Sequence, residues 1–254
     1  IGDLAGFVAS TYLRGIEFIG IPTTTLSQID SSIGGKVAIN LEHVKNIIGC
    51  FYHPSVVLID PETLKTLPKR HFVNGLVEAV KAGLIYDASI LDLFEHGNPE
   101  TQVDEIIYRS LLVKKAVVEQ DEKEQNLRKI LNFGHTLGHG IESVYGLSEL
   151  LHGECVAIGM IPMLEDEALK ERVLRIYEKL GLKSDVDYNA DVNTAGGVVG
   201  YVIYLITIFV MKKDKKAQGD SITVVKVKEA GKATLEKISM EQLYQFLKEI
   251  KPQS

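Results

Sequence analysis

The sequence predicts an α/β portion that ends near residue 73, followed by a mainly helical portion. Apolar runs at 16–21 and 55–60, each followed by a proline, have the length and composition of short buried strands, the second of them typical of a parallel sheet. From about residue 74 the apolar residues recur at helical spacing instead. The predicted domains are therefore 1–73 and 74–254.

Composition narrows the class of protein. A chain of 254 residues can form one large domain or two small ones, and 45% apolar with 24% charged residues is ordinary for a soluble globular protein. The formal net charge of −6 argues against a nucleic-acid partner. Cys50 and Cys155 are isolated, so we expect free thiols and a cytoplasmic location. The chain opens at Ile1 like the middle of a domain, so we expect a fragment.

Glycines and hydroxyl residues surround the first predicted strand. Gly2 and Gly6 flank Asp3 and predict a glycine-rich turn that feeds a helix, a common seat for phosphate or a dinucleotide. Three threonines at 23–25 follow the strand and Pro22. They either bind a ligand at the carboxyl end of the strand or start a helix, and both interpretations stay open.

The run Asp30-Ser-Ser-Ile-Gly-Gly-Lys36 resembles a P-loop but fails its pattern. Asp30 stands where the first glycine belongs, and Val37 stands where Ser or Thr belongs. The run still predicts a flexible, glycine-containing loop that exposes Lys36. Together with Lys45, this lysine either holds a small phosphate or carboxylate or is merely solvated.

Three of the seven histidines lie between residues 128 and 154. His135 and His139 are four apart, so on a helix they share one face, which we expect to begin at Arg128 and to include Asn132. His152 opens another apolar stretch. Two histidines and a distant carboxylate would form a metal site with an open position, whereas histidines that merely pack in the core or cap a helix are the alternative.

Glu78 is the candidate for the missing carboxylate. It lies three residues from Lys81 on one face of a predicted helix and has apolar neighbours. An ordinary surface ion pair with Lys81 is the alternative.

The remaining elements follow from periodicity. We expect a long amphipathic helix over 103–125, a small hairpin around a turn at Gly231, and a final helix from Met240. The uncharged run at 195–211 is near the lower limit of membrane-spanning length, but its glycines and β-branched residues favour a buried element.

Taken in order, these motifs resemble the 3-dehydroquinate synthase family over nearly the whole chain. The motifs are Pro-Thr-Thr, Asp-Ser-Ser-Ile-Gly-Gly-Lys, Lys-Asn-x-Ile-Gly, Leu-Lys-Thr-Leu-Pro, Gly-Leu-x-Glu-x-x-Lys, Leu-Asn-Phe-Gly-His-Thr-x-Gly-His, Leu-His-Gly-Glu and Asp-Lys-Lys. The resemblance implies part of a Rossmann-like dinucleotide-binding domain followed by a mainly α-helical metal-binding domain. It also implies that about the first hundred residues of the family pattern are missing.

The resemblance assigns roles to individual residues. It implies Zn²⁺, or Co²⁺, bound by Glu78, His135 and His152, which leaves His139 for proton transfer. Around NAD it implies Asp3, Thr23, Thr24, Lys45, Thr63, Leu64, Thr66 and Asn74. Around the substrate it implies Asp30, Lys36, Asn46, Lys81, Lys114, Arg128, Asn132, His139 and Lys215 or Lys216, with Arg14 reaching into a neighbouring subunit's site. Its catalytic residues would be His139, Glu124, Lys36 and Asn132.

The implied activity is that of a lyase of the shikimate pathway in a cytoplasmic homodimer. Such an enzyme converts 3-deoxy-D-arabino-heptulosonate 7-phosphate to 3-dehydroquinate and phosphate and regenerates NAD in each turnover. Three alternatives remain: another sugar-phosphate cyclase, a metal- and NAD-dependent polyol dehydrogenase that would release NADH, and a non-catalytic truncated form. Val37, Val44 and Gly140 depart from the usual residues of the family without removing a proposed catalytic group.

Overall fold

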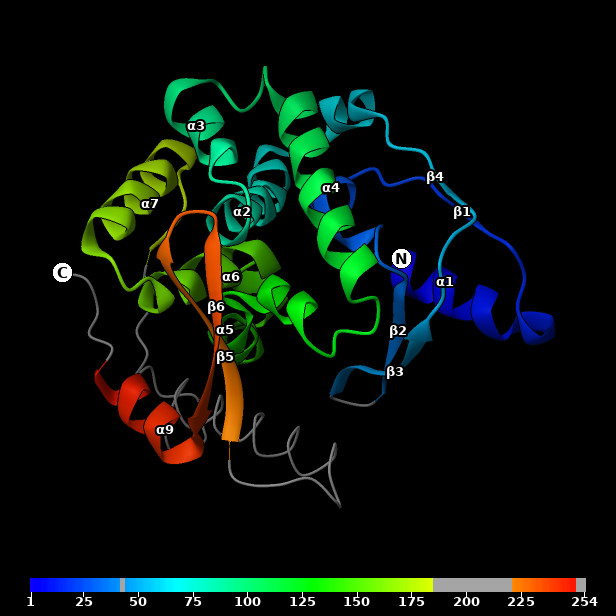
Figure 1. Ribbon diagram of the computed structural model, residues 1–254. Coiled ribbons are helices and arrows are strands. Elements are labelled where there is room, and N and C mark those ends of the chain that lie inside the picture. Colours follow the sequence, from blue (N-terminus) through cyan, green and yellow to red (C-terminus); the bar gives the residue numbers. More distant parts are fainter. Residues whose placement is uncertain (42–43, 185–220, 250–254) are drawn as a thin grey trace. The chain divides into compact units, whose positions relative to one another are not determined.

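The computed structural model describes residues 1–41, 44–184 and 221–249 (Figure 1). By packing, the chain forms two compact units, one of residues 1–82 with 89–128 and one of residues 83–88 with 129–254. These are packing units, and the predicted domain boundary at residue 73 stays a prediction. The 195–211 run, Lys215 and Lys216 lie outside the described residues.

The first unit contains the strands of the α/β portion. In chain order its elements are α1 (Gly2–Thr11), η1 (Tyr12–Arg14), β1 (Ile19–Gly20), η2 (Ser27–Ser31), β2 (Lys36–Leu41), β3 (Val44–Phe51), β4 (Val56–Val57), η3 (Pro61–Thr66), most of α2 (Lys69–Ile85), α3 (Ser89–His96) and α4 (Val103–Gln120). β1 and β4 are parallel neighbours, and β2 and β3 form an antiparallel hairpin (Figure 1).

Several details of the first unit differ from the sequence expectations. The two predicted strands shrink to β1 and β4 and are not buried, since Ile19 is 59% and Val56 is 45% exposed. Gly2 and Gly6 lie within α1 rather than in a turn, and a Cβ at Gly6 would collide with Val37. The segment 55–60 was expected to form a parallel strand, and β4 within it does pair in parallel with β1.

Helix α4 is shorter than the predicted helix because it stops at Gln120. Asp121 follows it, and its carboxylate accepts backbone hydrogen bonds from Gln125, Asn126 and Arg128 at 2.9, 2.7 and 3.0 Å. These bonds favour a loop over a further helical turn. The acidic residues up to Glu124 therefore belong to a loop.

The second unit is mainly helical. Its elements are the end of η4 (Leu127–Asn132), α5 (His135–Glu149), α6 (His152–Met160), η5 (Ile161–Met163), α7 (Glu167–Leu180), β5 (Ser221–Glu229), β6 (Lys232–Ser239) and α9 (Met240–Glu249). The predicted hairpin and final helix are confirmed, with a turn at Gly231, whose φ of +82° suits glycine. β5 packs beside η5, and Val224, Val225 and Val227 are buried.

Helix α6 belongs to the core of the second unit. α6 is buried along nearly its whole length, with Val156, Ala157 and Ile158 fully inaccessible. Within the described ranges no helix combines the length and apolar character needed to cross a membrane. The predicted fold class, an α/β portion and a helical portion, agrees with these elements.

Candidate functional site

Three histidines converge in the second unit. His135 is the first residue of α5, His139 lies one turn later, and His152 is the first residue of α6. The ring centroid of His135 is 5.3 Å from that of His139 and 5.3 Å from that of His152, and the other two rings are 5.8 Å apart. The side chains of His135 and His152 are partly buried, whereas His139 is exposed. The three histidines therefore form one cluster and do not pack separately in the core.

The helix that carries the first two histidines begins later than the sequence suggested. Arg128 and Asn132 lie in the 3₁₀ turn η4, and Gly134 then adopts a φ of +75°, which interrupts the helical backbone. The expectation that Arg128, Asn132 and His135 share one face of a continuous helix was wrong. Gly134 could have indicated this break, because a glycine often adopts a left-handed conformation where one helical segment ends and the next begins.

Close packing of α5 against α6 brings His152 to the other two histidines. A Cβ at Gly159 would collide with the carbonyl oxygen of Gly134, so the two backbones approach at a distance that only glycine permits. The start of α6 is fixed by Glu154, whose carboxylate accepts the backbone N–H of Leu151 at 2.8 Å. His152 is thereby held at the first position of α6.

The ring nitrogens of two histidines face oxygen atoms of the same unit. Nδ1 of His135 is 3.0 Å from the carbonyl oxygen of Phe133, and this oxygen can only accept a hydrogen bond, so Nδ1 carries the proton. Nδ1 of His152 is 3.6 Å from Oε2 of Glu142. An imidazole whose Nδ1 carries the proton, as in His135, binds a divalent metal through Nε2. The donor chemistry fits zinc.

Glu142 also gives the second unit an alternative set of ligands. Ligand atoms of His139, Glu142 and His152 lie within 4.8 Å of one another. Sequence reasoning missed Glu142, although it follows His139 by three residues on the same helical face.

The first unit holds a group of four charged residues, of which three are buried and Asp30 is partly exposed. Nζ of Lys114 donates to Oδ1 of Asp30 at 2.7 Å, Nζ of Lys81 is 4.0 Å from the same oxygen, and Lys81 also forms an ion pair with Glu78. Glu78 and Lys81 are each 2% exposed, so the interpretation as a surface pair was wrong. All four were predicted site residues.

The pKa values of the two lysines move in opposite directions. Burial lowers the pKa of Lys81, but Glu78 and Asp30 outweigh burial, and the pKa ends above its ordinary value. Burial also lowers the pKa of Lys114, and there Asp30 compensates only in part, so the pKa ends below its ordinary value.

A second group surrounds the glycine loop of the first unit. Nη2 of the buried Arg128 donates to the carbonyl oxygen of Gly34 at 2.8 Å, and its guanidinium lies 5.5 Å from the ring centre of Phe51. Gly34 has a φ of +103°, and a Cβ there would collide with the guanidinium. Lys36 starts β2 and forms an ion pair with Glu124. The predicted loop is thus present and is fixed to the residues that follow α4.

The loops after the two parallel strands are joined by Gln28, a residue that sequence reasoning missed. Its side chain is fully buried, and Nε2 donates to the carbonyl oxygens of Pro22 and Asp60 at 3.0 and 2.9 Å and to Oγ1 of Thr63 at 3.0 Å. Oγ1 of Thr24 accepts the backbone N–H of Ser27 at 3.3 Å, so the threonine run does start a helix. Loops at adjacent carboxyl ends of parallel strands are where α/β folds bind nucleotides.

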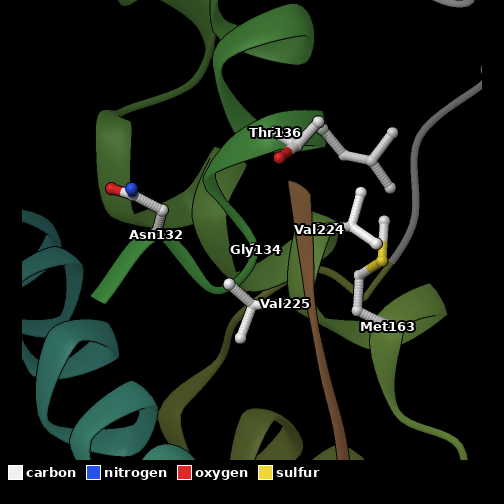
Figure 2. A pocket seen from close by; sticks show the side chains of 7 residues that line it. Asn132, Gly134, Thr136, Met163, Val224 and Val225 are labelled. Atoms are coloured by element: carbon white, nitrogen blue, oxygen red, sulfur yellow. The ribbon is translucent and has the colours of Figure 1, made fainter. Parts of the chain in front are cut away.

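Asn132 lines a small hollow of the second unit (Figure 2). Gly134, Thr136, Met163, Val224 and Val225 line it as well, and most of these side chains are apolar. None of the three clustered histidines is among the lining residues, so this hollow is distinct from the histidine cluster.

Other predicted residues have varied surroundings. Asn46 lies in β3 with a φ of +52°, and its N–H donates to Oδ1 of Asn40 at 3.0 Å. Arg14 has a φ of +70°. Asp3 lies in the first turn of α1, and burial raises the pKa of its carboxyl group. Asn74 is buried in α2, and the side chain of Lys45 is not among those described.

Solved structures define the class of protein. A 2-epi-5-epi-valiolone synthase from Streptomyces hygroscopicus subsp. jinggangensis 5008, with NAD⁺ and Zn²⁺ bound, is 28% identical with a TM-score of 0.80, over 96% of this chain and 69% of that one. A 2-deoxy-scyllo-inosose synthase with carbaglucose-6-phosphate, NAD⁺ and Co²⁺ is 25% identical with a TM-score of 0.78, over 98% of this chain and 71% of that one. The fold of the chain is therefore that of these two synthases, whose structures hold NAD⁺ with Zn²⁺ or Co²⁺.

The sequence comparisons identify the family. Residues 1–74 match the family model described as 3-dehydroquinate synthase N-terminal, and residues 75–200 match the one described as 3-dehydroquinate synthase C-terminal. The 3-dehydroquinate synthase of Thermoanaerobacter pseudethanolicus is 40% identical over 98% of this chain and 70% of its own length. The chain belongs to the 3-dehydroquinate synthase family, as the motifs predicted. The predicted lyase function agrees with this family.

Proposed function

We propose that the chain acts as a 3-dehydroquinate synthase on 3-deoxy-D-arabino-heptulosonate 7-phosphate, with NAD and a divalent metal. The observation that carries the proposal is the convergence of His135, His139 and His152 in a chain of this family. The buried Lys81 and Lys114 of the first unit are hydrogen-bond donors suited to the hydroxyl and carboxylate groups of a sugar acid.

The metal is proposed to bind His135, His152 and Glu78. Two imidazoles and a carboxylate are a ligand set of catalytic zinc sites, which keep a position open for substrate. A bound metal supplies Lewis acidity toward the substrate hydroxyls, and NAD supplies reversible hydride transfer. Zn²⁺ is the first choice and Co²⁺ the second.

The substrate is proposed to contact the charged and polar residues of the family motifs. Lys36, Arg128 and a lysine of the 215–216 pair would neutralise the phosphate and hold it in position to leave, and Asn46 would donate an amide hydrogen bond to it. Asp30, Lys81, Lys114 and Asn132 would bind the sugar hydroxyls and carboxylate. These assignments follow the family motifs and the burial of Lys81 and Lys114.

Proton transfer is assigned to His139, with Glu124 in support. His139 is the exposed member of the histidine cluster, and an exposed imidazole can exchange its proton with substrate or water. Glu124 already forms an ion pair with Lys36. We assign both an acid–base role.

NAD is proposed to bind along the loops that follow β1 and β4. Gln28 joins these loops, which supports placing Thr23, Thr24, Thr63, Leu64 and Thr66 at one nucleotide site. Asp3, Lys45 and Asn74 complete the proposed set. We further propose a cytoplasmic homodimer in which Arg14 reaches the neighbouring subunit's site, and light scattering of the chain and of Arg14→Ala would test it.

The activity is tested by following phosphate release and NADH absorbance together. The chain receives the heptulosonate 7-phosphate, Zn²⁺ and NAD in an amount far below that of substrate. Phosphate release without net NADH is the expected result. Accumulation of NADH would instead indicate a dehydrogenase, and absence of both would contradict the proposal.

Two sets of variants separate metal binding from proton transfer. Glu78→Ala, His135→Ala and His152→Ala should lose bound zinc, whereas His139→Ala should keep one zinc per chain and lose turnover. Zinc retained in the first three would refute the ligand assignment.

A further inference from the structure

Glu142 is a buried carboxylate that the proposed chemistry leaves without a role. It lies in the middle of α5, and only 7% of its surface is exposed. A buried carboxylate is costly unless positive charge or hydrogen-bond donors face it. Oε2 of Glu142 lies 3.6 Å from Nδ1 of His152, so the neighbouring imidazole is such a partner.

The spacing on α5 places Glu142 beside the histidines. It follows His135 by seven residues and His139 by three, and residues at these separations lie along one face of a helix. His152 begins α6, whose close packing on α5 brings its ring to the same face. Glu142 is therefore next to a proposed metal ligand, on the side of Nδ1.

We propose that Glu142 is a positioning residue for His152, and this inference rests on the proposed function. Its carboxylate accepts the Nδ1 proton of His152, which fixes the orientation of the ring and directs Nε2 toward the metal. The carbonyl oxygen of Phe133 does the same for His135, at 3.0 Å. Each metal-binding histidine thus has its own acceptor behind it, one neutral and one charged.

The carboxylate of Glu142 should strengthen metal binding by His152. A carboxylate behind an imidazole raises the basicity of the ligating nitrogen and limits rotation of the ring, so removing it weakens metal binding without removing a ligand. At 3.6 Å, Oε2 of Glu142 and Nδ1 of His152 lie just beyond hydrogen-bond distance, so the proposed bond requires a shift of a few tenths of an ångström in either side chain.

The competing interpretation makes Glu142 itself a ligand. Ligand atoms of His139, Glu142 and His152 lie within 4.8 Å of one another, which is close enough for one ion. The two interpretations differ in what they require of His139. If Glu142 only positions His152, removing the imidazole of His139 leaves zinc bound.

The experiment measures the zinc affinity of the full chain against a competing chelating dye. Glu142→Gln keeps the size of the side chain and removes its charge, and zinc affinity should fall about 10- to 100-fold while saturating zinc still binds one ion per chain. Glu149→Gln, an exposed carboxylate two turns further along α5, is the matched control and should remain within twofold of the unaltered chain. Thermal unfolding of the zinc-free proteins checks the fold.

A coupling measurement distinguishes positioning from a general effect on the fold. In a His152→Ala background the site no longer holds zinc at stoichiometric concentrations, so the weak residual affinity left by His135 and Glu78 is measured at high zinc. There Glu142→Gln should cause no further loss of zinc affinity, because its only route to the metal has been removed. An equal loss in both backgrounds would overturn the proposal. If Glu142→Gln does not fold, Glu142→Asp replaces it. This shorter carboxylate should weaken zinc several-fold in the unaltered chain and not in the His152→Ala background.

The remaining outcomes are also decisive. Loss of zinc from His139→Ala together with loss from Glu142→Gln would show Glu142 to be a ligand and would overturn the proposal. Equal zinc affinity of Glu142→Gln and the unaltered chain would overturn it as well and leave the proposed function intact. If the unaltered chain binds no zinc, the metal site of the proposed function fails and this inference fails with it.

Discussion

Replacing Gln28 with methionine tests whether this side chain holds the two loops of the proposed NAD site together. Methionine is similar in length and apolar, so the substitution removes the donors with little change in volume. The side-chain amide has two hydrogens shared among three acceptors, in Pro22, Asp60 and Thr63. At most two full hydrogen bonds are therefore lost.

The loss of unfolding free energy depends on which hydrogen bonds each acceptor keeps after the substitution. The carbonyl oxygen of Asp60 still accepts from the N–H of Thr63 at 3.2 Å and from its Oγ1 at 2.7 Å, so the carbonyl is not left unsatisfied. Two bonds at about 1 kcal/mol each give about 2 kcal/mol. Against this, Oε1 of Gln28 is buried without a hydrogen-bond partner among the described residues, and its removal is favourable. The expected loss of unfolding free energy is about 1–2 kcal/mol.

Urea unfolding and NAD titration together provide the assay. Gln28→Met should lower the unfolding midpoint and weaken NAD about tenfold, because the loops lose their fixed spacing. Gln120→Met is the control, since Gln120 is exposed on α4 and its side chain donates to the carbonyl oxygen of Ala116, one turn earlier, at 2.9 Å. An unfolding free energy and an NAD affinity equal to those of the unaltered chain would refute the role of Gln28.

Three further predictions concern packing and charge. Gly159→Ala should reduce the unfolding free energy by about 1–3 kcal/mol in thermal melts and weaken zinc, because a Cβ collides with Gly134. Lys114→Met should cost about 3 kcal/mol in urea unfolding by leaving Asp30 short of a partner, whereas the exposed Lys115→Met should stay within about 0.5 kcal/mol. Burial raises the pKa of Asp121, but three backbone donors outweigh it and the pKa ends below its ordinary value. The resulting stability is present above about pH 4 and lost as the pH falls further, so Asp121→Asn should be less stable than the unaltered chain at pH 7 and equal to it in acid. Equal stability at pH 7 would contradict this.

Elements with strong local patterns could be predicted from the sequence. The hairpin at Gly231 and the helix from Met240 needed only alternation, a glycine and an apolar period. Strand lengths could not be predicted in this way, because an apolar run specifies burial only if neighbouring strands cover it. In the described structure β1 has β4 as its strand neighbour, and Ile19 stays exposed.

Contacts between distant residues account for the site details that the sequence did not show. His135 and His139 were expected on one helical face because their spacing is local, and that expectation is confirmed. Gln28 gave no signal, since nothing near it in the sequence indicates that its partners lie 32 and 35 residues away. The same holds for Lys114 and Asp30, which are 84 residues apart.

The paired charges of the first unit affect how the proposed site would bind an anion. Asp30 and Glu78 balance Lys81 and Lys114, and Glu124 balances Lys36, so these six residues carry no net charge as a group. These ion pairs reduce the free-energy cost of burying Lys81 and Lys114. They also leave the two lysines with little uncompensated positive charge for an incoming phosphate. A divalent metal on Glu78 would change this, because it competes with Lys81 for the same carboxylate and adds charge of its own. Metal and phosphate should therefore favour each other's binding, and by linkage the effect must be equal in both directions.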